Sequence, residues 1–144
     1  MEDQDCGANW TWFNSHGLPE RWVTRVAIDP TDADTVYATF SGFRNGEAAA
    51  HVFKTTNGGG TWKDISGNLP NAPVNDVVID VERSTVYVGS DVGVFYLKNG
   101  KKNWKPVGEG LPLAPVLDLR LHAPSDTLYT NTFGRSMWKL SLED

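Results

Sequence analysis

The chain of 144 residues has room for one compact domain, and its 40% apolar and 22% charged residues favour a packed core over disorder. A net charge of −5 argues against nucleic-acid binding, and the single cysteine, Cys6, excludes an intramolecular disulfide and a multi-cysteine zinc site. No apolar run reaches the roughly 20 residues of a membrane-spanning helix. The acidic start lacks the pattern of a signal peptide, which leaves the location of the protein open.

In chain order, one unit occurs three times. Each copy contains a Leu-Pro pair, an apolar stretch, a tyrosine-bearing stretch and an aromatic position, and the apolar stretches are Val23–Asp29, Val74–Asp80 and Val116–His122. Tyr87 and Tyr129 lie 42 positions apart (87 to 129), as do Pro70 and Pro112 (70 to 112). A period of about 40 to 45 residues with four short strands per unit is typical of β-propeller blades. The sequence therefore predicts an all-β fold of four-stranded antiparallel blades with almost no helix.

The predicted blades leave the ring incomplete. We expect a fourth strand at 8–15, complete blades at 23–66 and 74–108, and strands one to three of a last blade at 116–142. Propellers need about four to eight blades, and they close by sharing one blade between the two chain ends. We therefore expect two chains to exchange N-terminal strands in a homodimeric six-bladed ring. The alternative is a piece cut from a longer propeller.

The hairpin between strands three and four carries the most specific local motif, Thr55-Thr-Asn-Gly-Gly-Gly-Thr-Trp62. Asn57 provides an acceptor for nearby backbone N–H groups, Gly59 provides a positive φ, and Trp62 provides apolar area. Related copies occur near both Trp10 and Trp104. We interpret all three copies as structural turns that hold no metal, and their residues are Asp5, Gly7, Trp10, Thr55, Asn57, Gly59, Thr61, Trp62, Asn99 and Trp104.

This motif resembles the Asp-box, or BNR repeat, Ser/Thr-x-Asp-x-Gly-x-Thr-Trp, with Asn57 in place of the usual aspartate. The whole chain resembles the closing blades of bacterial Asp-box propellers, whose last strand often reads much like Phe133-Gly-Arg-Ser-Met-Trp138. Such propellers occur in sialidases, sortilin-type receptors, xyloglucan-degrading glucanases and photosystem assembly factors. The resemblance implies the fold and leaves two functions open, because one fold hosts many activities. These are a noncatalytic scaffold that binds a carbohydrate or a protein, and a glycoside hydrolase.

Loops from strand four to strand one share a face with loops from strand two to strand three, because the strands alternate in direction. This face also carries the long insertion at 41–51, and grafted sites favour such loops. We expect its ligand-binding rim to contain Arg21, Trp22, Phe43, Arg44, Asn45 and Arg135. Candidate catalytic carboxylates are Glu47 and Asp91, with Glu20 nearby on the same rim, because glycosidases use paired carboxylates. The Phe/Tyr-Arg-Ile-Pro motif of sialidases has no counterpart here, since Asn45-Gly46 follows Phe43-Arg44.

The third residue of each strand one is charged: Arg25, Asp76 and Asp118. Since strand one is innermost in a blade, we expect these residues to form a hydrated channel lining with Arg–Asp pairs; a site for a small cation is the alternative. The three histidines, His16, His51 and His122, show no ligand spacing and are expected at the surface or in turns. The sequence predicts no cofactor and no metal.

Overall fold

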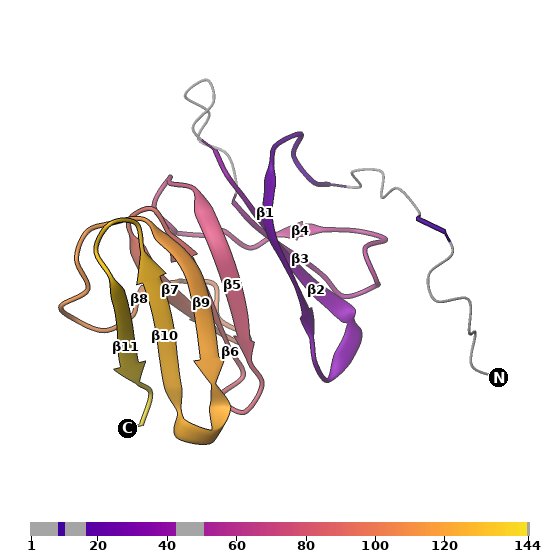
Figure 1. Ribbon diagram of the computed structural model, residues 1–144. Coiled ribbons are helices and arrows are strands. Elements are labelled where there is room, and N and C mark those ends of the chain that lie inside the picture. Colours follow the sequence, from indigo (N-terminus) through magenta and orange to yellow (C-terminus); the bar gives the residue numbers. More distant parts are fainter. Residues whose placement is uncertain (1–8, 11–16, 43–50, 144) are drawn as a thin grey trace.

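Three antiparallel β-sheets, which lie one after another along the chain, make up the regular structure of the computed structural model (Figure 1). The model describes residues 9–10, 17–42 and 51–143. The first sheet contains β1 (Val23–Asp29), β2 (Asp32–Phe40), β3 (Val52–Thr55) and β4 (Lys63–Asp64). The second contains β5 (Val74–Asp80), β6 (Thr85–Ser90), β7 (Gly93–Lys98) and β8 (Lys105–Pro106), and the third contains β9 (Val116–His122), β10 (Thr127–Thr132) and β11 (Met137–Ser141).

Each sheet keeps its strands in chain order, with every neighbouring pair antiparallel. The described residues form no α-helix, and a 3₁₀ turn at Ala123–Ser125 is their one helical segment. The prediction of all-β, antiparallel blades is confirmed. The strands form because β-branched and aromatic residues alternate along them and turn residues separate them, as between Asp29 and Asp32.

The third sheet has three strands, and its β11 edge has no fourth strand among the described residues. The strand predicted at 8–15 lies mostly outside the described residues. Asn9 and Trp10 are the described part of that segment, and they belong to no strand. They lie apart from all three sheets (Figure 1), and the Trp10 side chain is fully exposed, at 101%.

The three sheets repeat the same backbone details. In each sheet the pairing of strands one and two shifts by one residue, which leaves Thr24, Asn75 and Leu117 as bulged residues. In each sheet the loop after strand two donates a backbone hydrogen bond to the residue before strand one: Ser41 to Trp22, Asp91 to Pro73 and Phe133 to Pro115. These matching bonds establish which positions of the three sheets are equivalent.

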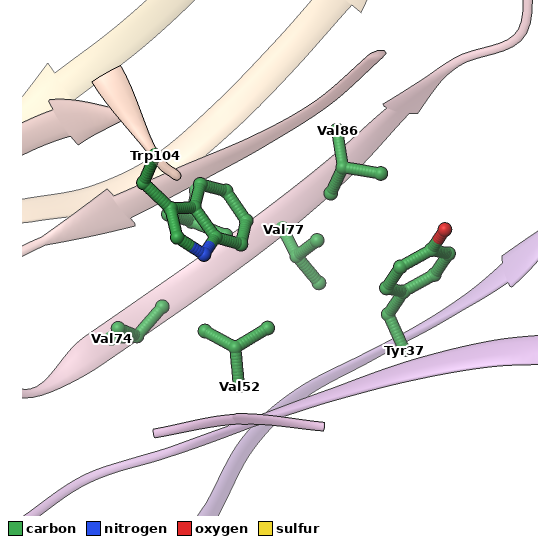
Figure 2. Packing of buried hydrophobic residues seen from close by; sticks show 7 residues of the cluster. Tyr37, Val52, Val74, Val77, Val86 and Trp104 are labelled. Carbon is green, nitrogen blue, oxygen red and sulfur yellow. The ribbon is translucent and has the colours of Figure 1, made fainter. Parts of the chain in front are cut away.

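The core consists of apolar layers between consecutive sheets. Between the first and second sheets, Tyr37 and Val52 pack against Val74, Val77, Val86, Val88 and Trp104 (Figure 2). Between the second and third sheets, Tyr87 and Val94 pack against Val116, Leu119 and Leu128. Each fully buried apolar side chain in such a layer contributes about 1.5 to 3 kcal/mol, so these layers hold the sheets together.

A third cluster covers part of the outer face of the first sheet. Phe40 and Phe53 meet edge to face with ring centroids 5.4 Å apart, and Ala38 lies beside them. Leu18 and Trp62 pack over this cluster. The rest of this face, along β1, remains exposed.

Candidate functional site

The hairpin turn that follows β3 is closed by one side chain. Asn57 Oδ1 accepts hydrogen bonds from the Thr61 backbone N–H (2.9 Å) and the Thr55 hydroxyl (2.8 Å), and Asn57 Nδ2 donates to Thr61 Oγ1 (3.1 Å). Gly59 has the predicted positive φ, at +92°. The Asn57 amide is thus engaged on both its oxygen and its nitrogen within the turn, as a structural turn requires.

The tryptophans that follow the three turn motifs have different surroundings. Trp104 is buried between the first and second sheets, and its Nε1 donates to the Ile65 carbonyl at 2.7 Å. Trp62 is half-buried against the cluster on the outer face of the first sheet. The Trp10 side chain is fully exposed. Asp5 and Gly7 lie outside the described residues.

Asp76 connects all three sheets through its carboxylate. Oδ1 lies 3.0 Å from Arg25 Nε on the first sheet and accepts from the Val77 N–H (2.8 Å), while Oδ2 accepts from the Leu119 N–H on the third sheet (2.6 Å). Burial raises the pKa of Asp76, whereas the two N–H donors and Arg25 lower it. The prediction of a hydrated position is wrong for Asp76, which is buried because the neighbouring sheets enclose it. Asp118 is partly exposed and pairs with Arg120 at 2.9 Å.

A polar cluster lies at the base of the long insertion. His51 Nε2 is 3.0 Å from Asn71 Oδ1, and His51 Nδ1 is 3.5 Å from Arg21 Nη1, which also donates to the Ser41 carbonyl (3.1 Å). A neutral ring that carries its proton on Nε2 satisfies both contacts, because Nδ1 is then free to accept from Arg21. A Cβ at Gly42 would stand 2.4 Å from Arg21 Nη1 and 2.6 Å from His51 Cε1, so a larger residue there would displace this cluster.

One prediction, that for His51, is corrected by this cluster. His51 is buried, not at the surface or in a turn, because it directly precedes β3 and its ring contacts Asn71 on the β4–β5 loop. Arg21 turns toward His51 and the Phe40 ring, 6.0 Å from its centroid, and so forms part of the base of the rim. Asn71 was missed by sequence reasoning, and no pattern around it signals the contact. His122 is exposed beside Ser125 in a turn, as predicted.

Of the predicted rim residues that the structure describes, Trp22 and Arg135 are exposed, and Phe133, which was not among the predicted rim residues, is exposed on the same loop as Arg135. Trp22 is 68% exposed and Phe133 is 70% exposed, each on a loop of the same face. Glu20 and Arg135 are exposed, and Asp91 accepts a hydrogen bond from Asn75 Nδ2 at 2.8 Å. Phe43, Arg44, Asn45, Glu47 and His16 lie outside the described residues.

The part of the chain that the structure describes has neither a metal-binding cluster nor a membrane-spanning helix. There, no group of three or more His, Cys, Asp and Glu side chains gathers closely enough to hold a metal ion. No helix in that part is long and apolar enough to cross a membrane.

The outer faces of the first and third sheets are exposed at positions whose counterparts between the sheets are buried. Val26 on β1 is 55% exposed, whereas its counterpart Val77 on β5 is 1% exposed. On the other end face, Met137 of β11 is 81% exposed, whereas its counterpart Val52 is fully buried. Since a neighbouring sheet is what buries these positions, each end face lacks one neighbour.

Comparisons with known proteins rest on structure. No protein family and no curated protein matches the chain by sequence. A GH74 xyloglucanase from Xanthomonas campestris matches 81% of this chain with a TM-score of 0.64 at 14% identity. An ancestral GH74 enzyme matches 76% of it with a TM-score of 0.57 at 26% identity. The three sheets have the fold of propeller blades.

The chain is much shorter than these neighbours. It spans 20% of the xyloglucanase and 16% of the ancestral enzyme. The structural similarity therefore covers only some consecutive blades of these longer proteins.

Proposed function

We propose that this chain is a noncatalytic propeller scaffold, that two copies close a six-bladed ring, and that the rim of the ring binds a carbohydrate. The exposed aromatic residues of the rim, Trp22 and Phe133, are the observation that carries the binding function. Flat aromatic faces beside polar groups suit sugar rings, which present apolar C–H faces and hydroxyl edges.

The unpartnered end faces support the ring. Bulged Thr24 donates to the Val74 carbonyl of the next sheet, and bulged Asn75 donates to the Val116 carbonyl. Their counterpart Leu117 is apolar and exposed, as is Val23, the counterpart of Val74 and Val116. At the junction of two copies, Leu117 of one copy therefore packs against Val23 of the other.

The same junction completes the rim. Trp22 precedes β1 and Phe133 follows β10, so at the proposed junction, where the third sheet of one copy faces the first sheet of the other, both lie on loops of the same face. In the ring, Trp22 of one copy thus shares this face with Phe133 of the other copy. The carbohydrate site is then built by both chains.

Calorimetric titration with a xyloglucan oligosaccharide tests this function, since the structural neighbours include a xyloglucanase. We expect Trp22→Ala and Phe133→Ala each to weaken binding at least about tenfold, as loss of a stacking platform does. The control is Val81→Ala, an exposed apolar change on the turn at the opposite face. If both rim variants bind the oligosaccharide as tightly as the native chain does, and their mass in solution equals that of the native chain, the proposal is contradicted.

A glycoside hydrolase is the second candidate, favoured by the likeness to GH74 enzymes. Asp91 and Glu47 are its candidate carboxylates. Release of reducing ends from xyloglucan, abolished by Asp91→Asn or Glu47→Gln, would establish this activity and overturn the noncatalytic proposal.

A further inference from the structure

An apolar hollow of about 60 Å³ lies between the outer strands of the second and third sheets. Its apolar lining comes from Val94, Val107, Leu111, Leu128, Trp138 and Leu140. We call this hollow the socket. It lies beside β11, the strand that has no fourth strand next to it among the described residues.

The corresponding space between the first and second sheets is filled by Trp104. The six apolar residues of the socket have as counterparts Val52, Ile65, Leu69, Val86, Phe95 and Leu97, and all six belong to or pack against the cluster that holds Trp104 (Figure 2). The strand registers match as well. Val86 pairs with Leu97 as Leu128 pairs with Leu140.

Backbone contacts place the two spaces in the same register. The Ile65 N–H donates to the Val52 carbonyl at 3.0 Å, and the Val107 N–H donates to the Val94 carbonyl at 3.0 Å. Trp104 Nε1 donates to the Ile65 carbonyl, so the Val107 carbonyl is the matching acceptor in the socket. The Asn68 side chain accepts from the Trp104 N–H and donates to the Trp104 carbonyl. Its counterpart at the socket is Gly110, which has no side chain, so the indole contributes a larger share of the binding there.

Trp10 follows a copy of the turn motif, because Asp5, Gly7 and Trp10 keep the spacing of Asn57, Gly59 and Trp62, and Trp12 does not. Trp62 and Trp104 each precede the next strand one by 12 positions (62 to 74 and 104 to 116), and Trp10 precedes Val23 by 13 (10 to 23). Trp10 is therefore the strand-four tryptophan of the blade that comes before β1, and it is fully exposed in the single chain. The socket belongs to the blade at the other end, after the second sheet.

We propose that the socket binds Trp10 of a second copy of this chain, with its indole N–H donating to the Val107 carbonyl. In a ring of two chains each copy fills the socket of the other with its Trp10. This inference rests on the proposed two-chain ring and adds the residue that locks each junction.

The test compares dimer dissociation constants, measured by light scattering on dilution, for the full chain and its variants. We expect Trp10→Ala to weaken the dimer at least about 30-fold, as removal of a central aromatic anchor does, and Trp10→Phe to restore part of the loss. The matched control is Trp12→Ala, because Asp64 and Pro106, its counterparts after Trp62 and Trp104, are exposed. Circular dichroism checks that every variant is folded.

A double-mutant cycle with Leu140→Ala locates the contact. If Trp10 fills the socket, the combined variant loses less affinity than the product of the two single losses, because both changes remove one contact. If the native chain is a dimer and Trp10→Ala weakens it no more than Trp12→Ala does, the socket proposal is overturned while the proposed ring stands. The same holds if the losses in dimer affinity from Trp10→Ala and Leu140→Ala multiply. A wild-type chain that is monomeric at every concentration overturns both.

Discussion

Single polar side chains fix the geometry of one turn in the first sheet and of the inner strand in the second sheet. Asn57 does so in the turn after β3, and Asp76 does so on β5, where its carboxylate meets three donors. Both side chains act within the fold, which is why neither is a candidate for binding or catalysis.

Asn57→Ala is expected to lower the free energy of unfolding by about 1 to 2 kcal/mol, because the Thr61 N–H and the Thr55 hydroxyl lose their acceptor. Asn57→Asp keeps that acceptor and is expected to lose less. Denaturant unfolding measures both. The control is Asn99→Ala, since the Asn99 side chain has no hydrogen bond to any described residue; equal losses at Asn57 and Asn99 contradict this account.

Asp76→Asn is expected to lower the free energy of unfolding by about 2 to 3 kcal/mol, because a buried acceptor of the Leu119 N–H and the partner of Arg25 is altered. Glu82→Gln also removes one negative charge, at an exposed position. Its free energy of unfolding is expected to stay within about 0.5 kcal/mol of that of the native chain. Urea unfolding of the two variants side by side checks this. Indistinguishable midpoints would show that Asp76 does not tie the sheets together.

At the scale of strands and turns, one ion-pair network links the β5–β6 turn to the β9–β10 turn. Arg83 Nη1 lies 2.9 Å from Asp126 Oδ1 and 3.4 Å from Asp80 Oδ2. The hydrogen bond from Arg83 lowers the pKa of Asp126 below its ordinary value of 3.8. Because the pKa of Asp126 is lower in the folded chain than its ordinary value of 3.8, the pair stabilises the fold at a pH above 3.8. This stabilisation is lost as the pH falls and the carboxylate is protonated.

Asp126→Asn is therefore expected to lower the Tm slightly at pH 7, since the pair is partly exposed to solvent. The difference from the native chain is expected to narrow as the pH falls below about 3.8. Calorimetric scans from pH 7 to pH 3 measure it, and 1 M salt is expected to reduce the difference at pH 7. A gap that widens in acid contradicts the assigned pair.

The elements could be predicted where their signal is local. The 42-residue period and the apolar stretches located β1, β5 and β9, and the turn motif located the Asn57 hairpin. The burial of Asp76 and His51 could not be predicted, because it depends on which side chains of a neighbouring sheet or loop face them. The socket depends on the register between two sheets, which no local pattern records.

At the scale of the whole molecule, both end faces carry side chains that inner sheets bury. Val23, Val26 and Ile28 line one face, and Leu117, Tyr129 and Met137 lie on the other, which also carries charged Asp118 and Arg120. Asp76 accepts from the Leu119 N–H of the next sheet, and in the proposed ring its counterpart Asp118 would accept from the Val26 N–H of the other copy in the same way.

Ile28→Lys is expected to convert the dimer to a monomer, because it places a charge in the apolar face along β1 where Ile28 is 61% exposed. Val81→Lys introduces the same charge on a turn and is expected to leave the dimer intact. Sedimentation velocity distinguishes the two. Dimers of equal strength in both variants would mean that this face is not an interface.

The central claim is that the three blades are half of a ring. Light scattering of the native chain over a range of dilutions tests it most directly. The account predicts a mass of twice 15.9 kDa, returning to 15.9 kDa only when the dimer is diluted below its dissociation constant. A mass of 15.9 kDa at every concentration, with the sheets intact, would contradict it.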